Sequence, residues 1–277
     1  MHRTPPITQS QTRPQPWALP SSAYRLETLA EHFAPISLKE MDSVALLNRI
    51  DTKFIMSSGQ LLQALAAIWP DYRMLSVNSQ RINHYRTLYF DTPNFDLYHL
   101  HINKRADIYK VRSREYTDSR LAFLEVKHKN HKGRTIKERI ATAEPILQMN
   151  TQAERWLHNV YPFDSQSLQP KIWNTFRRLT LVSKTNCERV TLDVDLTFYT
   201  QDQIASLDGI AIAEVKMDSG RCRSPFLAQM HAQRIHPRGF SKYCIGVSML
   251  YGQVKKNAMK PKLLRLEKIM KGTATYE

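Results

Sequence analysis

Cysteine is scarce in this sequence, and long apolar runs are absent. The chain has 277 residues and three cysteines, Cys187, Cys222 and Cys244, which form neither a CxxC pair nor a zinc-ligand spacing. A disulfide framework is therefore excluded, and a reducing, cytoplasmic location is expected. No apolar run approaches the roughly 20 residues of a transmembrane helix, so the sequence predicts no membrane span of its own and leaves a membrane-protein partner open.

Acidic residues are also under-represented. The 25 Asp and Glu face 40 Lys and Arg, which gives a formal net charge of +15. An excess of this size predicts a polyanionic partner, whether nucleic acid, nucleotide, polyphosphate or an anionic membrane surface. Composition alone does not choose among these partners, and it does not give the oligomeric state.

The sequence predicts one domain behind a short tail. Residues 1–21 are rich in Pro, Gln, Ser and Thr and lack the apolar core of a signal peptide, so they are expected to be disordered. Residues 22–277 show no repeat and no linker. Helices are predicted within 22–48, where Ser37 and Glu40 have capping-box spacing, and over 60–69, over 143–161, from Pro225 behind Ser224, and in a basic segment from Lys260.

Between these helices the hydrophobic period is two, which indicates β-strands. The strands are expected at 49–56, 72–77, 82–92, 106–116, 121–129, 134–140, 171–184, 189–200 and 209–219. A turn is expected at Gly133. The pattern favours an α+β fold built on an antiparallel sheet of about eight strands.

Charged side chains recur on one face of nearly every predicted strand, because residues i and i+2 of a strand share a face. The charged faces comprise Arg49, Asp51 and Lys53; Lys110, Arg112 and Arg114; Glu125, Lys127 and Lys129; Lys137 and Arg139; Arg189, Asp193 and Asp195; and Glu214 and Lys216. The opposite faces are Val, Ile, Leu and Ala.

A sheet with one solvated side would give the same alternation, but solvated faces normally mix charges of both signs. Here cations dominate, and two cations ~4 Å apart repel by about 4 kcal/mol at an effective dielectric near 20. Converging cations therefore need an anion between them. This predicts a closed barrel that is apolar outside and charged inside, with helices packed on the outside. Such a lumen suits a multiply charged phosphate, and its isolated carboxylates suit Mg²⁺ or Mn²⁺.

Several ordered motifs resemble a known family. They are RIDTKF, YFDTPNFDLY, KVRSREY, FLEVKHKNHKGRTIKERI, RVTLDVDL, AEVKMD and GFSKYCIGV, spread from about Ile36 to Gly252. Together they resemble the VTC domain, the polyphosphate polymerase module of the triphosphate tunnel metalloenzymes, in a stand-alone bacterial form. The resemblance implies a closed, eight-stranded antiparallel tunnel. It also implies transfer of the γ-phosphoryl group of ATP to polyphosphate with Mn²⁺ or Mg²⁺.

The resemblance also implies roles for particular residues. Catalytic contacts to phosphate are expected from Lys53, Arg112, Arg114, Lys127, Lys137, Arg178, Arg189 and Lys242. Glu214 is the expected metal ligand. Ser241 and Lys242 are expected on the last strand, with Arg238 as the nearest substitute for a further basic residue. The strand faces add Arg49, Lys110, Lys129, Arg139 and Lys216 as phosphate-binding candidates.

The sequence departs from the family pattern in its first motif and in one aromatic position. The first strand reads Arg-Ile-Asp-Thr-Lys rather than Glu-x-Glu-x-Lys, which argues against the adenylate cyclase and thiamine-triphosphatase branches. Phe176 stands where a tyrosine is expected.

Two other functions remain open. One is hydrolysis of tripolyphosphate or a nucleoside triphosphate in the same tunnel, and the other is binding of polyphosphate or inositol phosphates without catalysis. Nucleic acid is not expected, because the cations follow strand period beside phosphate-type motifs. The roles of Asp51, Glu125, Asp193 and Asp195 are left between metal ligation and ion pairing.

Overall fold

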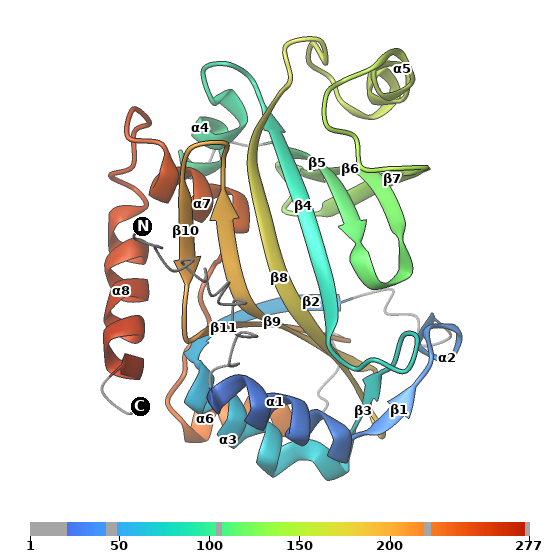
Figure 1. The fold of residues 1–277 in the computed structure, drawn as a ribbon, viewed down its shortest axis with the longest axis vertical. Helices are drawn as coiled ribbons and strands as arrows, with labels where there is room; N and C mark the ends of the chain where they lie inside the picture. Colours follow the sequence, from blue (N-terminus) through green and yellow to red (C-terminus); the bar gives the residue numbers. More distant parts are fainter. Residues whose placement is uncertain (1–20, 43–48, 104–106, 219–222, 275–277) are drawn as a thin grey trace, which may run out of the picture.

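An antiparallel sheet is the centre of the structure. The computed structural model describes residues 21–42, 49–103, 107–218 and 223–274. Eight strands follow one another across the sheet: β2 (Arg49–Ser57), β11 (Ile210–Asp218), β9 (Glu188–Tyr199), β8 (Gln169–Ser183), β4 (Asn83–Asp91), β5 (Ile108–Tyr116), β6 (Leu121–Lys129) and β7 (Thr135–Thr142) (Figure 1). The α+β class and the antiparallel pairing of the main sheet are as predicted.

Three short strands extend this sheet. β1 (Ala34–Ile36) pairs in parallel with β3 (Tyr72–Leu75), and β3 pairs with β8. β10 (Ile204–Leu207) pairs with the end of β9. β3 corresponds to the strand predicted over 72–77, whereas β1 and β10 were not predicted, because each is too short to give a clear alternation.

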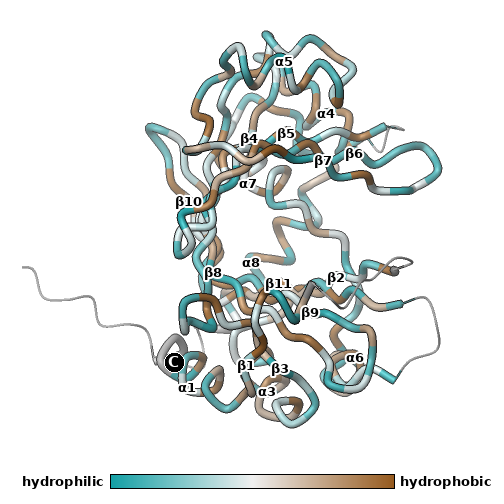
Figure 2. Tube along the Cα trace, turned by 90° about the vertical axis from the view of Figure 1, so that its right-hand side faces the viewer, coloured by the Kyte–Doolittle hydropathy of each residue, from teal (hydrophilic) through white to brown (hydrophobic). Residues whose placement is uncertain are grey.

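The sheet is strongly curled but open, so the predicted closed barrel is corrected. Among the described residues, β2 pairs only with β11 and β7 pairs only with β6. Strands β4–β7 face the layer of β2, β9 and β11 across the concave side (Figure 2).

The convex side of the sheet is apolar and covered by helices, as predicted. Val190, Leu192 and Val194 of β9 point outward into one core with α1 (Ser21–His32), α3 (Ser58–Ile68) and α6 (Pro225–Ala232). A second core joins β5 and β6 to α5 (Thr151–Val160). Burial of these outward side chains supplies the hydrophobic stabilisation that a charged interior does not give.

Helix α7 (Lys242–Leu250) lies on the concave side, which corrects two predictions. Ser241 and Lys242 begin a helix rather than a strand, because the Ser241 hydroxyl accepts a hydrogen bond from the Cys244 amide as an N-cap. Side chains of α7 share a buried cluster with inward-facing residues such as Phe176 and Ile212. Not all helices are therefore outside, and α7 fills one end of the concave side.

Two further helices belong to the same end of the molecule. α4 (Asp96–Ile102) and α8 (Lys260–Ala274) contribute Tyr98 and Leu266 to the cluster around α7. Helix α8 confirms the predicted basic C-terminal helix. Within the described ranges, no helix has the combination of length and hydropathy that crossing a membrane requires.

The predicted helix caps are confirmed where a side chain accepts a hydrogen bond from a backbone amide. Ser37 and Glu40 form the predicted capping box of α2 (Leu38–Asp42), and Ser224 caps α6. Gly133 has φ +76° in the turn between β6 and β7. Short 3₁₀ turns occupy Trp69–Asp71 and Thr117–Ser119.

The helix predicted over 143–161 is too long. It begins at Thr151, because Asn150 caps it through the Ala153 amide. The predicted tail lies outside the described residues, apart from Ser21, the first residue of α1.

Replacing Gly246 by alanine tests the packing of α7. A Cβ at this position would lie 2.6 Å from both Ile172 Cδ1 and Phe198 Cδ1. We expect Gly246→Ala to lower the free energy of unfolding by roughly 1–3 kcal/mol, the usual cost of overpacking, in urea titrations followed by circular dichroism. The matched control is Gly272→Ala in α8, where a Cβ would meet no atom within 4 Å. Unchanged or higher stability of Gly246→Ala would contradict this packing.

Candidate functional site

A cavity of about 730 Å³ occupies the concave side of the sheet, and every strand of the eight-strand path contributes to its wall. Strand register explains this, because the inward-facing residues of each antiparallel strand recur at every second position. The predicted charged lumen therefore exists as a pocket within an open sheet.

Most of the predicted site residues line this pocket. They are Lys53, Lys110, Arg112, Arg114, Lys127, Lys137, Arg139, Arg178, Arg189, Glu214, Lys216, Ser241 and Lys242. Two predicted residues lie elsewhere: Lys129 is exposed at the end of β6, and Arg238 is exposed while its backbone amide donates to the Lys53 carbonyl over 2.8 Å. Arg49 begins β2 opposite Asp218, and its side chain lies outside what the structure describes.

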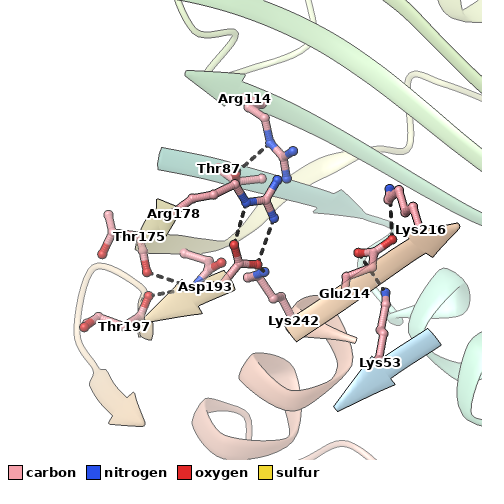
Figure 3. Close-up of polar contacts among 11 residues, drawn as sticks. Lys53, Thr87, Arg114, Thr175, Arg178, Asp193, Thr197, Glu214, Lys216 and Lys242 are labelled. Carbon is pink, nitrogen blue, oxygen red and sulfur yellow. Dashed lines mark hydrogen bonds and ion pairs between the residues drawn. The ribbon is translucent and has the colours of Figure 1, made fainter. Parts of the chain in front are cut away.

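Glu214 lies between two lysines on the pocket wall. Its carboxylate is 3.4 Å from Lys53 Nζ of the neighbouring strand and 3.0 Å from Lys216 Nζ, as Figure 3 shows. Burial would raise the pKa of Glu214, but Lys53 and Lys216 hold it well below its usual range. The group is therefore a carboxylate at neutral pH and is available to a cation.

Asp193 gathers two cations at another part of the wall. Its carboxylate accepts hydrogen bonds from Arg178 Nε at 2.5 Å and Arg178 Nη2 at 2.8 Å, and it also contacts Lys242 Nζ (Figure 3). Asp193 is only 3% exposed. Burial opposes its ionisation, yet Arg178 and Lys242 keep its pKa below the usual range. Asp193 is thus an ion-pair partner that brings the guanidinium and the ammonium together.

An aromatic pair lies beneath these cations. The rings of Tyr85 and Phe176 stack with centroids 5.1 Å apart. Lys242 Nζ lies 4.2 Å from the Phe176 centroid, and the Arg178 guanidinium carbon lies 5.0 Å from that of Tyr85. Phe176 supplies no hydroxyl, but its ring face attracts cations that have been removed from water.

Glu125 is the third carboxylate of the site that contacts two cations. It is fully buried and lies 2.6 Å from Arg112 Nε and 2.5 Å from Lys137 Nζ. Burial alone would raise its pKa, but Arg112, Arg114 and Lys137 hold it well below the usual range. Glu125 therefore joins β5, β6 and β7 through charge.

Asp195 does not share the inner face of β9 with Asp193, which corrects the predicted alignment. Its φ is +54°, and the register between β8 and β9 shifts beside it. This bulge turns Asp195 outward, where it lies 2.5 Å from Arg177. Asp51, the fourth carboxylate whose role was open, lines the pocket.

Burial lowers the pKa of several pocket lysines. Burial first, and then repulsion from neighbouring cations such as Lys53, lowers the pKa of Lys127 to about 7. Burial likewise lowers the pKa of Lys110 and of Lys242 to about 8. The three carboxylates hold part of the positive charge in place, and an entering anion would neutralise the rest.

The carboxylates fit a divalent metal that arrives with phosphate. No group of three or more His, Cys, Asp or Glu side chains among the described residues is arranged to hold a metal ion. Mg²⁺ and Mn²⁺, however, are commonly held by one or two carboxylates together with phosphate oxygens and water. Glu214 is charged and on the pocket wall, so this donor set fits a metal shared with the ligand.

Sequence reasoning missed the aromatic part of the wall. Tyr85 and Tyr89 of β4 and Tyr116 and Phe123 of the β5–β6 hairpin line the pocket. Each lies on the inner face at strand period, so alternation was the signal that could have found them. They were not predicted, because the predicted site was built on charged residues.

This pocket and sheet define an antiparallel α+β fold with an inward cationic face. The family model described as "VTC domain" matches residues 48–251. The chain therefore belongs to the VTC domain family, which confirms the resemblance seen in its motifs. A search of functionally curated proteins finds no match.

Solved structures show weaker likenesses. A candidate adenylate cyclase from Vibrio parahaemolyticus is 14% identical, with a TM-score of 0.44, over 73% of this chain and 98% of that one. A plant protein from Hippeastrum, described as a candidate adenylyl cyclase with a dominant triphosphatase activity, is 15% identical with a TM-score of 0.41, over 73% and 96%. Similarities at this level carry no argument about what the chain does.

Anion binding should depend on pH through the pocket lysines. Because the pKa of Lys127 is about 7 and that of Lys110 about 8 in the free protein, these groups lose protons as pH rises through 7 and 8. A bound phosphate raises their pKa, so binding takes up protons and weakens toward pH 9. Calorimetric titration of tripolyphosphate at pH 8, in buffers of different ionisation enthalpy, measures this uptake. Proton release on binding would contradict the charge assignment.

Asp193→Asn should make folding depend on the ligand. Removing this charge leaves Arg178 and Lys242 buried without their counter-ion, which costs roughly 3–5 kcal/mol. Added tripolyphosphate supplies negative charge and should raise the melting temperature of Asp193→Asn by more than that of the parent protein. The control is Asp195→Asn, on the convex side, which should lose little and respond to tripolyphosphate as the parent does. Equal ligand responses in all three proteins would refute this role for Asp193.

Proposed function

We propose that the protein is a metal-dependent phosphotransferase that transfers the γ-phosphoryl group of ATP to the end of a polyphosphate chain. The observation that carries this proposal is the composition of the pocket wall. Lysines and arginines from seven of the eight strands converge around a few carboxylates. Membership of the VTC domain family supports the same conclusion.

The chemistry needs positioning and charge rather than a protein nucleophile. A terminal oxygen of the acceptor chain forms a bond to the γ-phosphorus, and the bond from that phosphorus to the β–γ bridging oxygen breaks. ADP leaves with the electron pair of that bond, and the chain is one phosphate longer. Guanidinium and ammonium groups stabilise the negative charge on the transferring and leaving oxygens.

Two pairs of cations, each joined by a carboxylate, would bind the phosphates. Arg178 and Lys242, joined by Asp193, form a fixed pair of donors for one phosphate. Arg112 and Lys137, joined by Glu125, form a second pair on β5 and β7. These pre-formed donors need no rearrangement when charge develops, which is the condition for electrostatic catalysis.

Glu214 is the residue that would hold Mn²⁺ or Mg²⁺. When bound, the metal would neutralise phosphate charge and polarise a phosphoryl oxygen. Lys53 and Lys216 occupy the Glu214 carboxylate in the free protein and would be released toward the phosphates. A carboxylate shared with phosphate oxygens suits both Mn²⁺ and Mg²⁺, so both ions are proposed.

Hydrolysis of tripolyphosphate or ATP is the second candidate function. The packing of α7 into one end of the concave side favours it, because a short product leaves by the mouth through which the substrate entered. Water would then replace the terminal oxygen of the chain as the acceptor, with the same cations and the same metal ligand. We propose a cytoplasmic location for either activity.

The test is the product formed from ATP. We expect the purified protein with ATP and Mn²⁺ to give a ladder of polyphosphate on a stained gel. Glu214→Gln, which keeps the side-chain shape and removes the charge, should lower the rate by roughly 10²-fold or more. Glu267→Gln on the exposed face of α8 is the matched control and should keep the parent rate.

Each product identifies one function. Free phosphate without a ladder would establish hydrolysis in place of polymerisation. Tight binding of polyphosphate with neither product would establish a binding protein and overturn both enzymatic proposals.

A further inference from the structure

The C-terminal part of the chain carries a concentration of positive charge outside the pocket. Between residues 255 and 271 the sequence has seven cations and one carboxylate, Glu267. All seven cations are exposed, and they are Lys255, Lys256, Lys260, Lys262, Arg265, Lys268 and Lys271. Among the described residues that line the pocket, none comes from this segment. The phosphate site therefore gives this charge no role.

Helix α8 is fixed to the protein by one face. Leu266 is 2% exposed, and Leu263, Ile269 and Met270 pack against the same buried cluster around α7. The helix runs along the outer edge of the molecule, as Figure 1 shows. Because the apolar stripe of α8 is covered by the protein, the opposite face of the helix points away from it.

The outward face of α8 is a row of cations around one leucine. Lys260, Leu264 and Lys268 follow one another at intervals of four residues, and side chains at this spacing lie on the same face of a helix. Lys271 continues the row, and Arg265 lies beside Leu264. We call Lys260, Leu264, Arg265, Lys268 and Lys271 the basic ridge. It is about 17 Å long, because a helix rises by roughly 1.5 Å per residue.

Leu264 indicates the kind of anion that the basic ridge fits. Its side chain is 54% exposed, although a lysine lies one turn before it and another one turn after it. A soluble polyanion such as polyphosphate has no apolar part that could cover this leucine. The surface of an anionic bilayer offers both partners, because charged headgroups lie directly above the acyl chains.

We propose that the basic ridge docks the protein on an anionic lipid bilayer, with its cations among the headgroups and Leu264 at the boundary with the acyl chains. Lys255 and Lys256, which precede α8 in the chain, add to the positive charge of this segment. The contact is peripheral, because α8 keeps its apolar face on the protein. The ridge lies outside the pocket, so lipid binding does not depend on the reaction proposed above.

Sedimentation of the full chain with lipid vesicles tests this docking. Vesicles of equal parts phosphatidylglycerol and phosphatidylcholine provide the anionic surface, and vesicles of phosphatidylcholine alone provide the neutral one. Excess tripolyphosphate is present throughout, so that an anion already occupies the pocket. We expect binding to the anionic vesicles only, and loss of that binding in about 0.5 M NaCl, because salt screens exposed charges.

The variant Lys260→Gln/Arg265→Gln/Lys268→Gln removes three charges from the basic ridge. Each Lys or Arg near an anionic surface contributes about fivefold to binding, so the affinity for anionic vesicles should fall roughly 100-fold. The three side chains are exposed, so the melting temperature and the affinity for tripolyphosphate should stay those of the parent protein.

Two further variants separate the ridge from net charge and from soluble polyanions. Lys132→Gln/Arg155→Gln/Lys184→Gln removes the same charge from three exposed positions elsewhere and should keep most of the affinity for vesicles. Leu264→Ser keeps every charge and should lower the affinity for anionic vesicles roughly three- to tenfold, because an apolar contact is lost. Its affinity for long-chain polyphosphate should be unchanged.

Each result supports or overturns the docking. Selective losses in the triple ridge variant and in Leu264→Ser support it. Equal losses in the two triple variants would show attraction by net charge alone and would overturn it. Absence of binding by the parent protein, or unchanged vesicle affinity of Leu264→Ser, would overturn the bilayer as partner. Loss of long-chain polyphosphate binding by the ridge variant would then identify a soluble polyanion instead. Formation of polyphosphate from ATP, or its absence, alters none of these outcomes.

Discussion

Repulsion among converging cations is the constraint on which this structure depends. Lysines and arginines from every strand of the main path except β4 line the same cavity. Three carboxylates on the inner face, Glu125, Asp193 and Glu214, each contact two of these cations. They reduce the repulsion among the cations but leave a net positive charge on the inner face. An anion that enters the cavity would lower this repulsion further. Burial and repulsion from neighbouring cations lower the pKa values of Lys127, Lys110 and Lys242.

Because the inner face of the sheet is charged, the hydrophobic stabilisation of the fold comes from other surfaces. The hydrophobic cores lie on the convex side under α1, α3, α5 and α6, and around α7 at one end of the concave side. Stability and binding are therefore assigned to opposite faces of the same strands, and substitutions on one face leave the other chemically intact. Helix α7 is the exception, because Lys242 at its start lines the pocket while Gly246 packs against the sheet.

The sequence predicted the strands and the inward direction of most charges, because strand period and charge are local properties. Lys53, Arg114 and Lys216 needed only alternation to be placed on the correct face. Closure of the barrel is not a local property, because it requires pairing between the edge strands β2 and β7, which lie far apart in the sequence. Ser241 and Lys242 were expected on a last strand, but they begin α7. Lys129 lies outside the pocket lining, at the exposed end of β6, although its cross-strand partner Thr135 lines the pocket. Asp195 failed because one residue with positive φ reverses the alternation that the prediction used.

The bulge at Asp195 also marks where the polar part of the inner face of β9 ends. Before it, β9 points Thr191 and Asp193 inward, and after it, the same strand points Leu196 and Phe198 inward toward α7. One added residue thus lets a single strand present a polar surface and then an apolar surface to the same side of the sheet. Moving that residue along β9 by two positions would lengthen or shorten the polar stretch by one row. The position of a single backbone irregularity therefore determines how far the polar surface extends along β9.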